Sequence, residues 1–295
     1  MEVLNTATPA TNAQASDFIA ARNLSILCDW SQRGIYARAV ITTENETIVS
    51  VLEGAYDHIL SITVNGHTVY SSDALGETES EKAELDLGML LSFVKTVDID
   101  AIRFLQDGID MNYALAIEGI KNPFGHEVGR TLFRKACAGF DESFYADPAS
   151  HIPASACEWG KILVTAAADA RMGGCNMPAM CTMGDGNQGI TAINPVIAAA
   201  QVWDIDEAHT LRAVALSHLV SIYIKSNIGK TTPFCMCGIG SASGVAAAIS
   251  YLRGATNTQV EAAIINLLSP MMGILCDGAK PVSYTHLRAH ETGAY

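Results

Sequence analysis

Short runs in which apolar and polar residues alternate dominate the N-terminal part of the chain. These runs cover residues 35–42, 47–52 and 59–64, and each is rich in β-branched side chains. Such alternation is typical of strands with one covered face. Asn65-Gly66 follows the third run, and Asn-Gly between apolar runs is a strong signal for a tight hairpin. We therefore predict a small antiparallel sheet.

After a polar segment at residues 71–80, the apolar positions recur with the spacing of helices. The predicted helices cover residues 81–95, 99–119, 127–139, a segment ending near 173–174, 196–203, 206–227, 242–252 and 258–268. We expect the helix at 196–203 to start at Asn194-Pro195, because Asn is a common N-cap residue and Pro fits the first helical turn. The helix at 206–227 is apolar on most sides, which indicates a buried helix in an all-helical layer.

The whole pattern predicts an α+β fold, with a small N-terminal antiparallel sheet followed by a mostly α-helical domain. We assign residues 1–80 to an incomplete N-terminal part and residues 81–281 to the helical domain. Residues 282–295 resemble the translation of a sequencing-library adapter, so we exclude them, with His286 and His290, as an artefactual tail. The chain is accordingly expected to be truncated at both ends.

Composition narrows the range of partners. Charged residues make up 17% of the chain, below the usual ~25%, which indicates that much of it is buried. The formal net charge of -13 disfavours nucleic acid and anionic lipid because like charges repel. Residues 231–252 carry no charge, but their glycine, serine and threonine content favours a buried helix over a membrane span. No secretory or transit signal opens the sequence, so we expect a cytoplasmic location.

A glycine-rich segment, Gly184-Asp-Gly-Asn-Gln-Gly189, is the first candidate binding site. It lacks the Gly-Lys-Ser/Thr ending of a P-loop and the preceding strand of a dinucleotide-binding loop. Backbone N–H groups that converge near the start of a helix suit a carboxylate or another small anion. The alternative is a tight connection between two helices, since glycine is common in such turns.

A narrow polar stripe on the predicted helix at 206–227 is the second candidate. Its members share one side of an otherwise apolar helix and are Ser217, His218, Ser221 and Lys225. Burying a histidine and a lysine without partners is costly, so the stripe indicates a wet or ligand-lined cavity. Two alternatives remain open: His218 is a hydrogen-bonded core residue, and Lys225 is a helix C-terminal charge.

Five of the eight cysteines fall between Cys175 and Cys276, and three of them suggest a metal centre. Cys235 and Cys237 share one turn, and Cys276 follows a separate predicted helix. Three thiolates from distant turns can hold an iron–sulfur cluster with one iron left open. Packing as small apolar side chains is the alternative. Structural zinc is disfavoured because the chain has no C-x2-C pair.

Six ordered motifs, with a further segment at residues 112–119, carry a resemblance to a known family. They are Ala170-Arg-Met-Gly-Gly174, Pro178-Ala-Met180, residues 184–192, residues 217–225, Cys235-Met-Cys-Gly238 and residues 273–280. With them the chain resembles the L-cysteine desulfidase family, which is related to the α domain of iron–sulfur L-serine dehydratases. The resemblance covers nearly all of residues 2–280.

The resemblance implies a [4Fe–4S] lyase, independent of pyridoxal phosphate, that eliminates sulfide from L-cysteine to give pyruvate, ammonia and hydrogen sulfide. L-Serine dehydratase with the same cluster is the alternative, and an inactive fragment of either enzyme is a third. The implied ligands are Cys276 and one of Cys235 and Cys237, while the third family cysteine lies in a Gly-Cys-Thr-Glu-Pro motif that this chain lacks. We expect the chain by itself to be inactive.

The resemblance also implies roles for polar residues. The substrate carboxylate is expected at the amides of Gly186 to Gly189. The assigned substrate-binding residues are Arg171, Gly186, Asn187, Gln188, Gly189 and Ser217, and the candidate bases are Lys225, His218 and Lys280. The stretch 181–185 departs from the common family form, and its Asp185 adds negative charge where a carboxylate is expected to dock. The expected partner is a small amino acid, and a homo-oligomer is a possible assembly.

Overall fold

The computed structural model describes residues 8–29, 31–32, 34–55, 58–73, 85–228, 232, 234–271 and 273–275. The chain divides into two compact units, Met1–Glu81 and Lys82–Tyr295, and each is described here by itself. The first unit contains a sheet and one helix, and the second is helical. The predicted α+β class is therefore confirmed.

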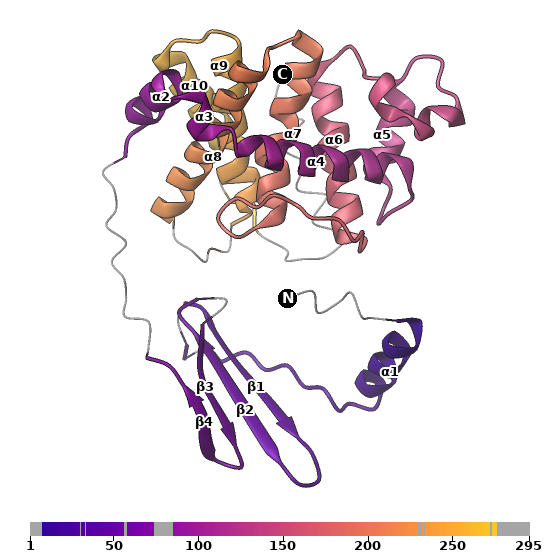
Figure 1. The fold of residues 1–295 in the computed structure, drawn as a ribbon, viewed down its shortest axis with the longest axis vertical. Coiled ribbons are helices and arrows are strands. Elements are labelled where there is room, and N and C mark those ends of the chain that lie inside the picture. The colour runs from indigo at the N-terminus through magenta and orange to yellow at the C-terminus, as the bar shows by residue number, and fades with distance from the viewer. Residues whose placement is uncertain are drawn as a thin grey trace. The chain divides into compact units, whose positions relative to one another are not determined.

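The sheet of the first unit is antiparallel, with its four strands side by side in chain order (Figure 1). The strands are β1 Tyr36–Thr42, β2 Thr47–Glu53, β3 Ile59–Val64 and β4 His67–Ser71. Asn65 and Gly66 connect β3 to β4 with φ values of 49° and 81°, as the mirror-image hairpin turn requires. The Asn65 side chain also accepts a hydrogen bond from the Thr47 N–H at 2.8 Å, so this turn holds β2 as well.

One helix of this unit, α1 Pro9–Ala20, was absent from the sequence prediction. Thr8 begins it with a capping box, in which the side chains of Thr8 and Thr11 each bond to the other residue's backbone. None of its residues is buried. Because it has no buried apolar face, its hydrophobic pattern could not reveal it.

The second unit is a layered helical domain. Its helices are α2 Leu87–Thr96, α3 Ile99–Ile102, α4 Leu105–Lys121, α5 Val128–Ala136, α6 Ala156–Met172, α7 Gly186–Trp203, α8 Glu207–Ile228, α9 Ala242–Leu252 and α10 Asn257–Met271. Short 3₁₀ helices cover Glu142–Ala146 and Pro148–Ser150, and the five-residue π-turn η4 covers Cys237–Ser241. None of the described helices is both long and apolar enough to cross a membrane.

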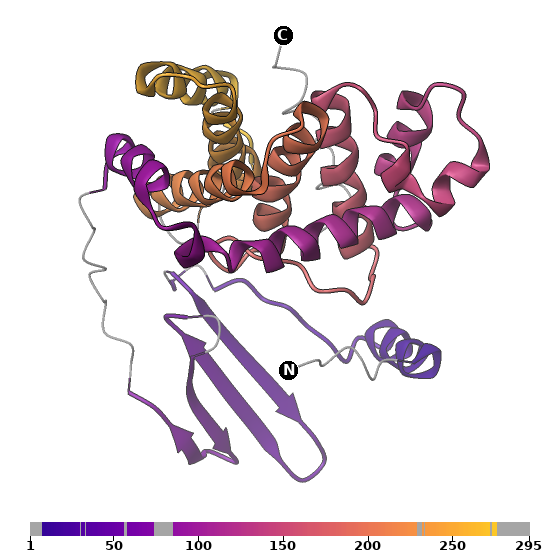
Figure 2. The ribbon, with the colours of Figure 1, turned by 45° about the horizontal axis from the view of Figure 1, so that its top comes forward.

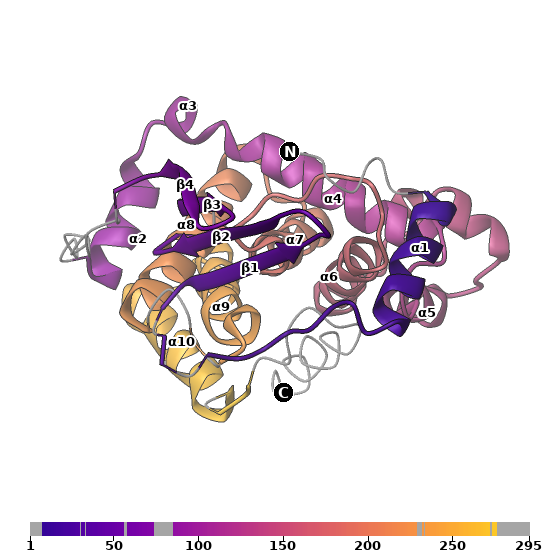
Figure 3. The same ribbon diagram turned by 90° about the horizontal axis from the view of Figure 1, so that it is seen from below.

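The central helix of this unit is α7. Figure 3 shows it between α6 on one side and α8 and α9 on the other, and Figure 2 shows α4 passing across α6 and α7. Ile193 and Val196 of α7 belong to the core formed with α2, α8 and α9, whereas Ile190 and Ala198 belong to the core formed with α4, α5 and α6. α7 thus joins two hydrophobic cores, which fixes its position firmly.

The predicted start of α7 is wrong. The helix begins at Gly186, after the N-cap Asp185, and Pro195 lies inside it. Asn194 caps nothing: it is fully buried, and its Nδ2 donates to the carbonyl of Leu163 at 3.2 Å in α6. Its amide links α7 to α6. Packing around α7 compensates for the backbone hydrogen bond that Pro195 cannot donate. The glycine-rich segment is therefore largely the first turn of α7.

The helix predicted at residues 99–119 is interrupted near Arg103 and forms α3 and α4. The helix predicted at residues 81–95 is observed from Leu87, where the Asp86 side chain accepts from the Met89 N–H. Residues 81–84 lie outside the described part of the chain. The other predicted helices match α5, α6, α8, α9 and α10 to within a few residues, and α9 matches at both ends.

Candidate functional site

A tight turn joins the segment before α7 to the helix itself. Thr182 and Asp185 form an isolated antiparallel bridge, with the N–H of Thr182 on the carbonyl of Asp185 at 3.1 Å and the reverse bond at 3.2 Å. Met183 and Gly184, between them, have φ values of 47° and 80° in the left-handed region. We call residues 182–185 the bridge loop. Its Thr182 hydroxyl and its Met183 carbonyl contact α8.

His218 of α8 contacts the bridge loop. Its Nδ1 lies 2.8 Å from Oγ1 of Thr182, whose side chain is 2% exposed. Its Nε2 is enclosed and has no hydrogen-bond partner among the described residues. Burial lowers the pKa of His218 to about 4, so the imidazole is neutral at physiological pH.

Lys225 lies two helical turns further along the same face of α8 and is 8% exposed. Its Nζ donates to the carbonyl of Met183 and to Oε1 of Gln188, both at 3.3 Å. No carboxylate in the described part of the chain forms an ion pair with it. A buried ammonium group therefore stands beside the bridge loop with only neutral oxygen partners.

The N-terminus of α7 carries a third set of polar contacts. Asp185 accepts from the backbone N–H of Gln188 at 3.1 Å and from its Nε2 at 3.2 Å. Arg171 of α6 donates to Oδ1 of Asn187 at 3.0 Å. A Cβ built on Gly186 would lie 2.6 Å from Nε of Arg171, so any other residue there would displace the guanidinium from this position. Arg171, Lys225 and the positive helix end thus outweigh the one carboxylate among them.

Two of the predicted substrate-binding residues have contacts that serve packing. A Cβ on Gly189 would lie 1.8 Å from the carbonyl oxygen of Met180, so this glycine lets the chain before the bridge loop lie against α7. Ser217 is fully buried, and its hydroxyl donates to the carbonyl of Ala192 in α7 at 2.7 Å. Their contact with a substrate stays a prediction.

The turn that carries Cys235 and Cys237, which we call the cysteine turn, packs against α8. Cys235 is 8% exposed, and Cys237 opens the π-turn η4. A Cβ on Gly244, which follows this turn in α9, would lie 2.2 Å from the carbonyl oxygen of Ser217. The start of α9, directly after the turn that carries the thiols, is therefore in close backbone contact with α8.

A second segment meets the cysteine turn. Phe234 and Leu275 form an isolated antiparallel bridge, and the Cys235 N–H donates to the carbonyl of Ile274 at 2.9 Å. Cys276, a predicted ligand, and Lys280, a predicted base, lie outside the described residues. The residue before Cys276 in the chain thus pairs with the residue before Cys235.

The metal centre expected from the cysteines stays a prediction. In the part of the chain that the structure describes, no three His, Cys, Asp or Glu side chains gather closely enough to hold a metal ion. Cys235 and Cys237 are nevertheless of the donor type that iron–sulfur clusters use. The described donors therefore fit such a cluster in kind, and the resemblance implies one of the two as a ligand.

Sequence reasoning missed Thr182 and Asn112 as parts of the site. Asn112 is fully buried in α4; its Oδ1 accepts from the Met180 N–H at 2.9 Å and so fixes the chain that enters the bridge loop. Both residues lay in stretches that the sequence had marked, the first in the divergent loop and the second in the segment at residues 112–119. Nothing in their spacing reveals which distant groups they contact.

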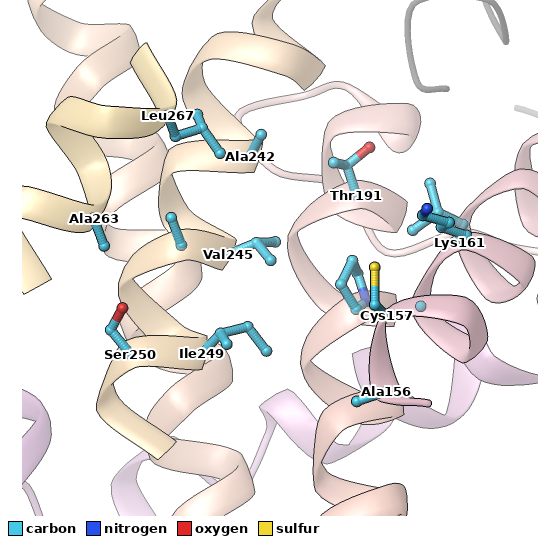
Figure 4. Close-up of a pocket in the computed structure, with 14 residues that line it drawn as sticks. Ala156, Cys157, Lys161, Thr191, Ala242, Val245, Ile249, Ser250, Ala263 and Leu267 are labelled. Atoms are coloured by element: carbon cyan, nitrogen blue, oxygen red, sulfur yellow. The ribbon is translucent and has the colours of Figure 1, made fainter. Parts of the chain in front are cut away.

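A separate cavity of about 420 Å³ lies between α6, α7, α9 and α10 (Figure 4). Its walls are mostly apolar, with Val245 and Ile249 of α9 facing Cys157 and Lys161 of α6. None of the predicted site residues that the structure describes lines it. The cavity is therefore distinct from the polar site around the bridge loop.

Comparison with known proteins identifies the family. A family model described as the serine dehydratase alpha chain matches residues 1–284. The chain belongs to this family. The resemblance drawn from the motifs is confirmed at this level, and the preference for cysteine stays a prediction.

Two curated relatives of this serine dehydratase alpha-chain family member carry the name UPF0597 protein. One from Desulforapulum autotrophicum is 33% identical over 95% of this chain and 63% of the relative. One from Nitratidesulfovibrio vulgaris is 37% identical over 83% of this chain and 58% of the relative. The chain thus spans less than two thirds of the length of these relatives. No solved structure matches the chain.

Proposed function

We propose that this protein is a serine-dehydratase-type lyase that removes the β-substituent of a small L-amino acid, with L-cysteine as substrate. One observation carries the proposal: the bridge loop bonds to both His218 and Lys225 beside the N-terminus of α7 and Arg171. The neutral imidazole of His218, the cations of Arg171 and Lys225 and the carboxylate of Asp185 then belong to one site. These groups suit the carboxylate and the ammonium group of a zwitterionic amino acid. L-Serine is the second candidate, since the matching family model is named for serine dehydratase.

The proposed reaction balances without an external oxidant. A base removes the α-proton of L-cysteine, the Cβ–S bond breaks, and sulfur leaves with its electron pair and is protonated to hydrogen sulfide. The resulting aminoacrylate tautomerises to an imine, which water hydrolyses to pyruvate and ammonia. With L-serine the leaving group is water, and the remaining steps are the same.

The residues of the site divide this work by their charge. Arg171 and the first two N–H groups of α7 hold the substrate carboxylate through charge-assisted hydrogen bonds, since the next two N–H groups, of Gln188 and Gly189, already donate to Asp185. Asp185, just before the first turn of α7, binds the substrate ammonium group through its negative charge. This is the proposed role of the stretch 181–185, which departs from the common family form. Lys225 is enclosed beside them by the carbonyl of Met183 and the amide of Gln188. Its burial keeps bulk water away from the α-proton.

The proposed ligands of a [4Fe–4S] cluster are Cys276 and one of the two cysteines of the cysteine turn, Cys235 and Cys237. Such a cluster with an open iron supplies a Lewis acid that improves the thiolate or hydroxyl as a leaving group. The chain contributes a shielded position, since Cys235 is 8% exposed and its backbone is held by Ile274. The packing of this turn on α8 keeps it close to the polar stripe.

Product analysis tests the proposal. The chain and the longer Desulforapulum autotrophicum relative are purified without oxygen in the presence of iron and sulfide. Each is then given L-cysteine or L-serine, and pyruvate, sulfide and ammonia are measured. We expect the longer protein to release pyruvate and sulfide in equal amounts from L-cysteine, faster than it releases pyruvate from L-serine. Pyruvate from neither amino acid in either protein contradicts the proposal.

Iron content gives the matched control within this chain. Bound iron is expected to fall when Cys235 and Cys237 are both replaced by alanine and to stay unchanged in Cys157→Ala, because Cys157 lies on α6 beside the separate cavity. Iron in the double variant equal to that in Cys157→Ala would show that the turn with Cys235 and Cys237 holds no cluster.

A further inference from the structure

The imidazole of His218 has one satisfied and one unsatisfied nitrogen. A neutral imidazole carries a single N–H, so one ring nitrogen donates and the other accepts. Nδ1 lies 2.8 Å from the Thr182 hydroxyl, whereas Nε2 is enclosed without a partner among the described residues. A buried polar atom without a partner costs free energy, about 1–3 kcal/mol, which a bound ligand can recover.

The Thr182 hydroxyl decides where the imidazole proton sits. Both backbone groups of Thr182 are engaged in the bridge with Asp185, and Nδ1 of His218 is the one partner that the described residues give to its hydroxyl. Donation by the hydroxyl leaves Nε2 with the ring proton. Donation by Nδ1 would leave the hydroxyl hydrogen of a side chain that is 2% exposed without an acceptor.

We propose that Nε2–H of His218 donates a hydrogen bond to the substrate carboxylate and that Thr182 is the positioning residue that fixes this tautomer. The inference rests on the proposed function, because it takes the substrate to be an amino acid bound at the bridge loop. The site needs such a neutral donor, since Arg171 and Lys225 already supply two positive charges. Burial keeps the ring neutral and so prevents a third charge.

This assignment changes the role expected of His218. With its proton on Nε2 and the Thr182 hydroxyl on Nδ1, the imidazole has no lone pair available to take the α-proton. His218 is then a substrate-binding residue and not a candidate base.

The tautomer is measured directly by NMR, without any catalysis. The chain is labelled with 15N-histidine, and the His218 signals are assigned by their loss in His218→Gln. Two-bond proton–nitrogen couplings, between the protons on the ring carbons and the ring nitrogens, distinguish the two tautomers. We expect Nε2–H in the wild type and in Thr182→Ser, which keeps the hydroxyl, and a shift toward Nδ1–H in Thr182→Val, which lacks it. Signals of the other histidines report whether each variant is folded.

Binding of L-alanine separates this inference from the lyase proposal. L-Alanine has the carboxylate and ammonium of the substrate but no leaving group. Its dissociation constant is expected to rise about threefold to tenfold in Thr182→Val, because the shifted tautomer weakens the hydrogen bond to the carboxylate, and to return to the wild-type value in Thr182→Ser.

Two outcomes overturn the inference: an Nδ1–H tautomer in the wild type, or unchanged L-alanine affinity in Thr182→Val despite an altered tautomer. Tight binding of L-alanine with no pyruvate from any amino acid would instead refute the lyase proposal and leave the role of Thr182 standing.

Discussion

Folding removes the imidazole of His218 from water and gives it one hydrogen-bond partner, Thr182. This burial makes the stability of the chain depend on pH. Burial lowers the pKa of the ring from 6.5 to about 4 in the folded chain. Between these two pKa values the unfolded chain binds more protons than the folded one. The free energy of unfolding must therefore decrease as the pH falls through this window.

We predict that the wild type loses stability relative to His218→Gln when the pH is lowered from about 7.5 to about 5. The stabilisation is fully present above pH 6.5 and is lost progressively toward pH 4, with an upper limit of about 3 kcal/mol for the whole window. Urea unfolding at both pH values measures it. His209→Gln is the control, because His209 is exposed. A pH dependence unchanged by His218→Gln would show that the ring is hydrated in the fold.

Residue spacing predicted part of this site. It placed His218 and Lys225 on one face of a helix, because positions seven apart align after two turns. It did not predict Thr182, whose hydroxyl reaches α8 only through the bridge with Asp185. Nor did it predict that Ser217 bonds to α7, since a polar residue on a buried face can serve a ligand or a neighbouring helix equally well.

At the scale of elements, close backbone contact at glycine sets the helix packing. A Cβ on Gly119 of α4 would lie 2.0 Å from the carbonyl oxygen of Ala166 in α6, and a Cβ on Gly129 of α5 would lie 2.3 Å from the Ala166 amide nitrogen. Both neighbouring helices therefore cross α6 at one alanine. By contrast, a Cβ on Gly160 of α6 would meet Cα of Pro195 at 3.4 Å, an ordinary contact.

This contrast predicts opposite effects for two identical substitutions. Gly119→Ala is expected to destabilise the chain by about 3 kcal/mol, because backbone atoms cannot move aside without separating the helices. Gly160→Ala is expected to be neutral or to stabilise by up to about 1 kcal/mol, because alanine is the better helix former. Denaturant unfolding of both variants provides the comparison. Equal destabilisation by the two changes would contradict the packing described for α4 and α6.

Local sequence rules predicted elements well where local forces decide. The hairpin at Asn65-Gly66 and the bounds of α9 followed from turn chemistry and apolar periodicity. The start of α7 did not, because Asn194-Pro195 has the features of a helix start while core packing on both sides favours an unbroken helix. The helix starts at Gly186, and the side chain of its N-cap, Asp185, accepts from the Gln188 N–H. The glycines around Asp185 pointed to a loop and not to a helix start.

At the scale of the whole molecule, the described site belongs entirely to the second unit. Every buried apolar side chain of the described core also lies there, beginning at Leu90. Fold class and family could both be predicted from the sequence, because they depend on many residues at once. The substrate could not, since L-cysteine and L-serine differ only in the leaving atom, and no spacing of side chains encodes that difference.

We propose that Arg171, the first turn of α7 and the α8 face together form an amino-acid site. Calorimetric titration of the chain with L-alanine tests it most directly, with Arg171→Met compared against Lys161→Met, whose lysine lines the separate cavity. The account predicts that Arg171→Met weakens binding about tenfold to a hundredfold, as for loss of a charge-assisted hydrogen bond, while Lys161→Met binds like the wild type. Equal affinity in all three proteins, or no binding by the wild type, would contradict it.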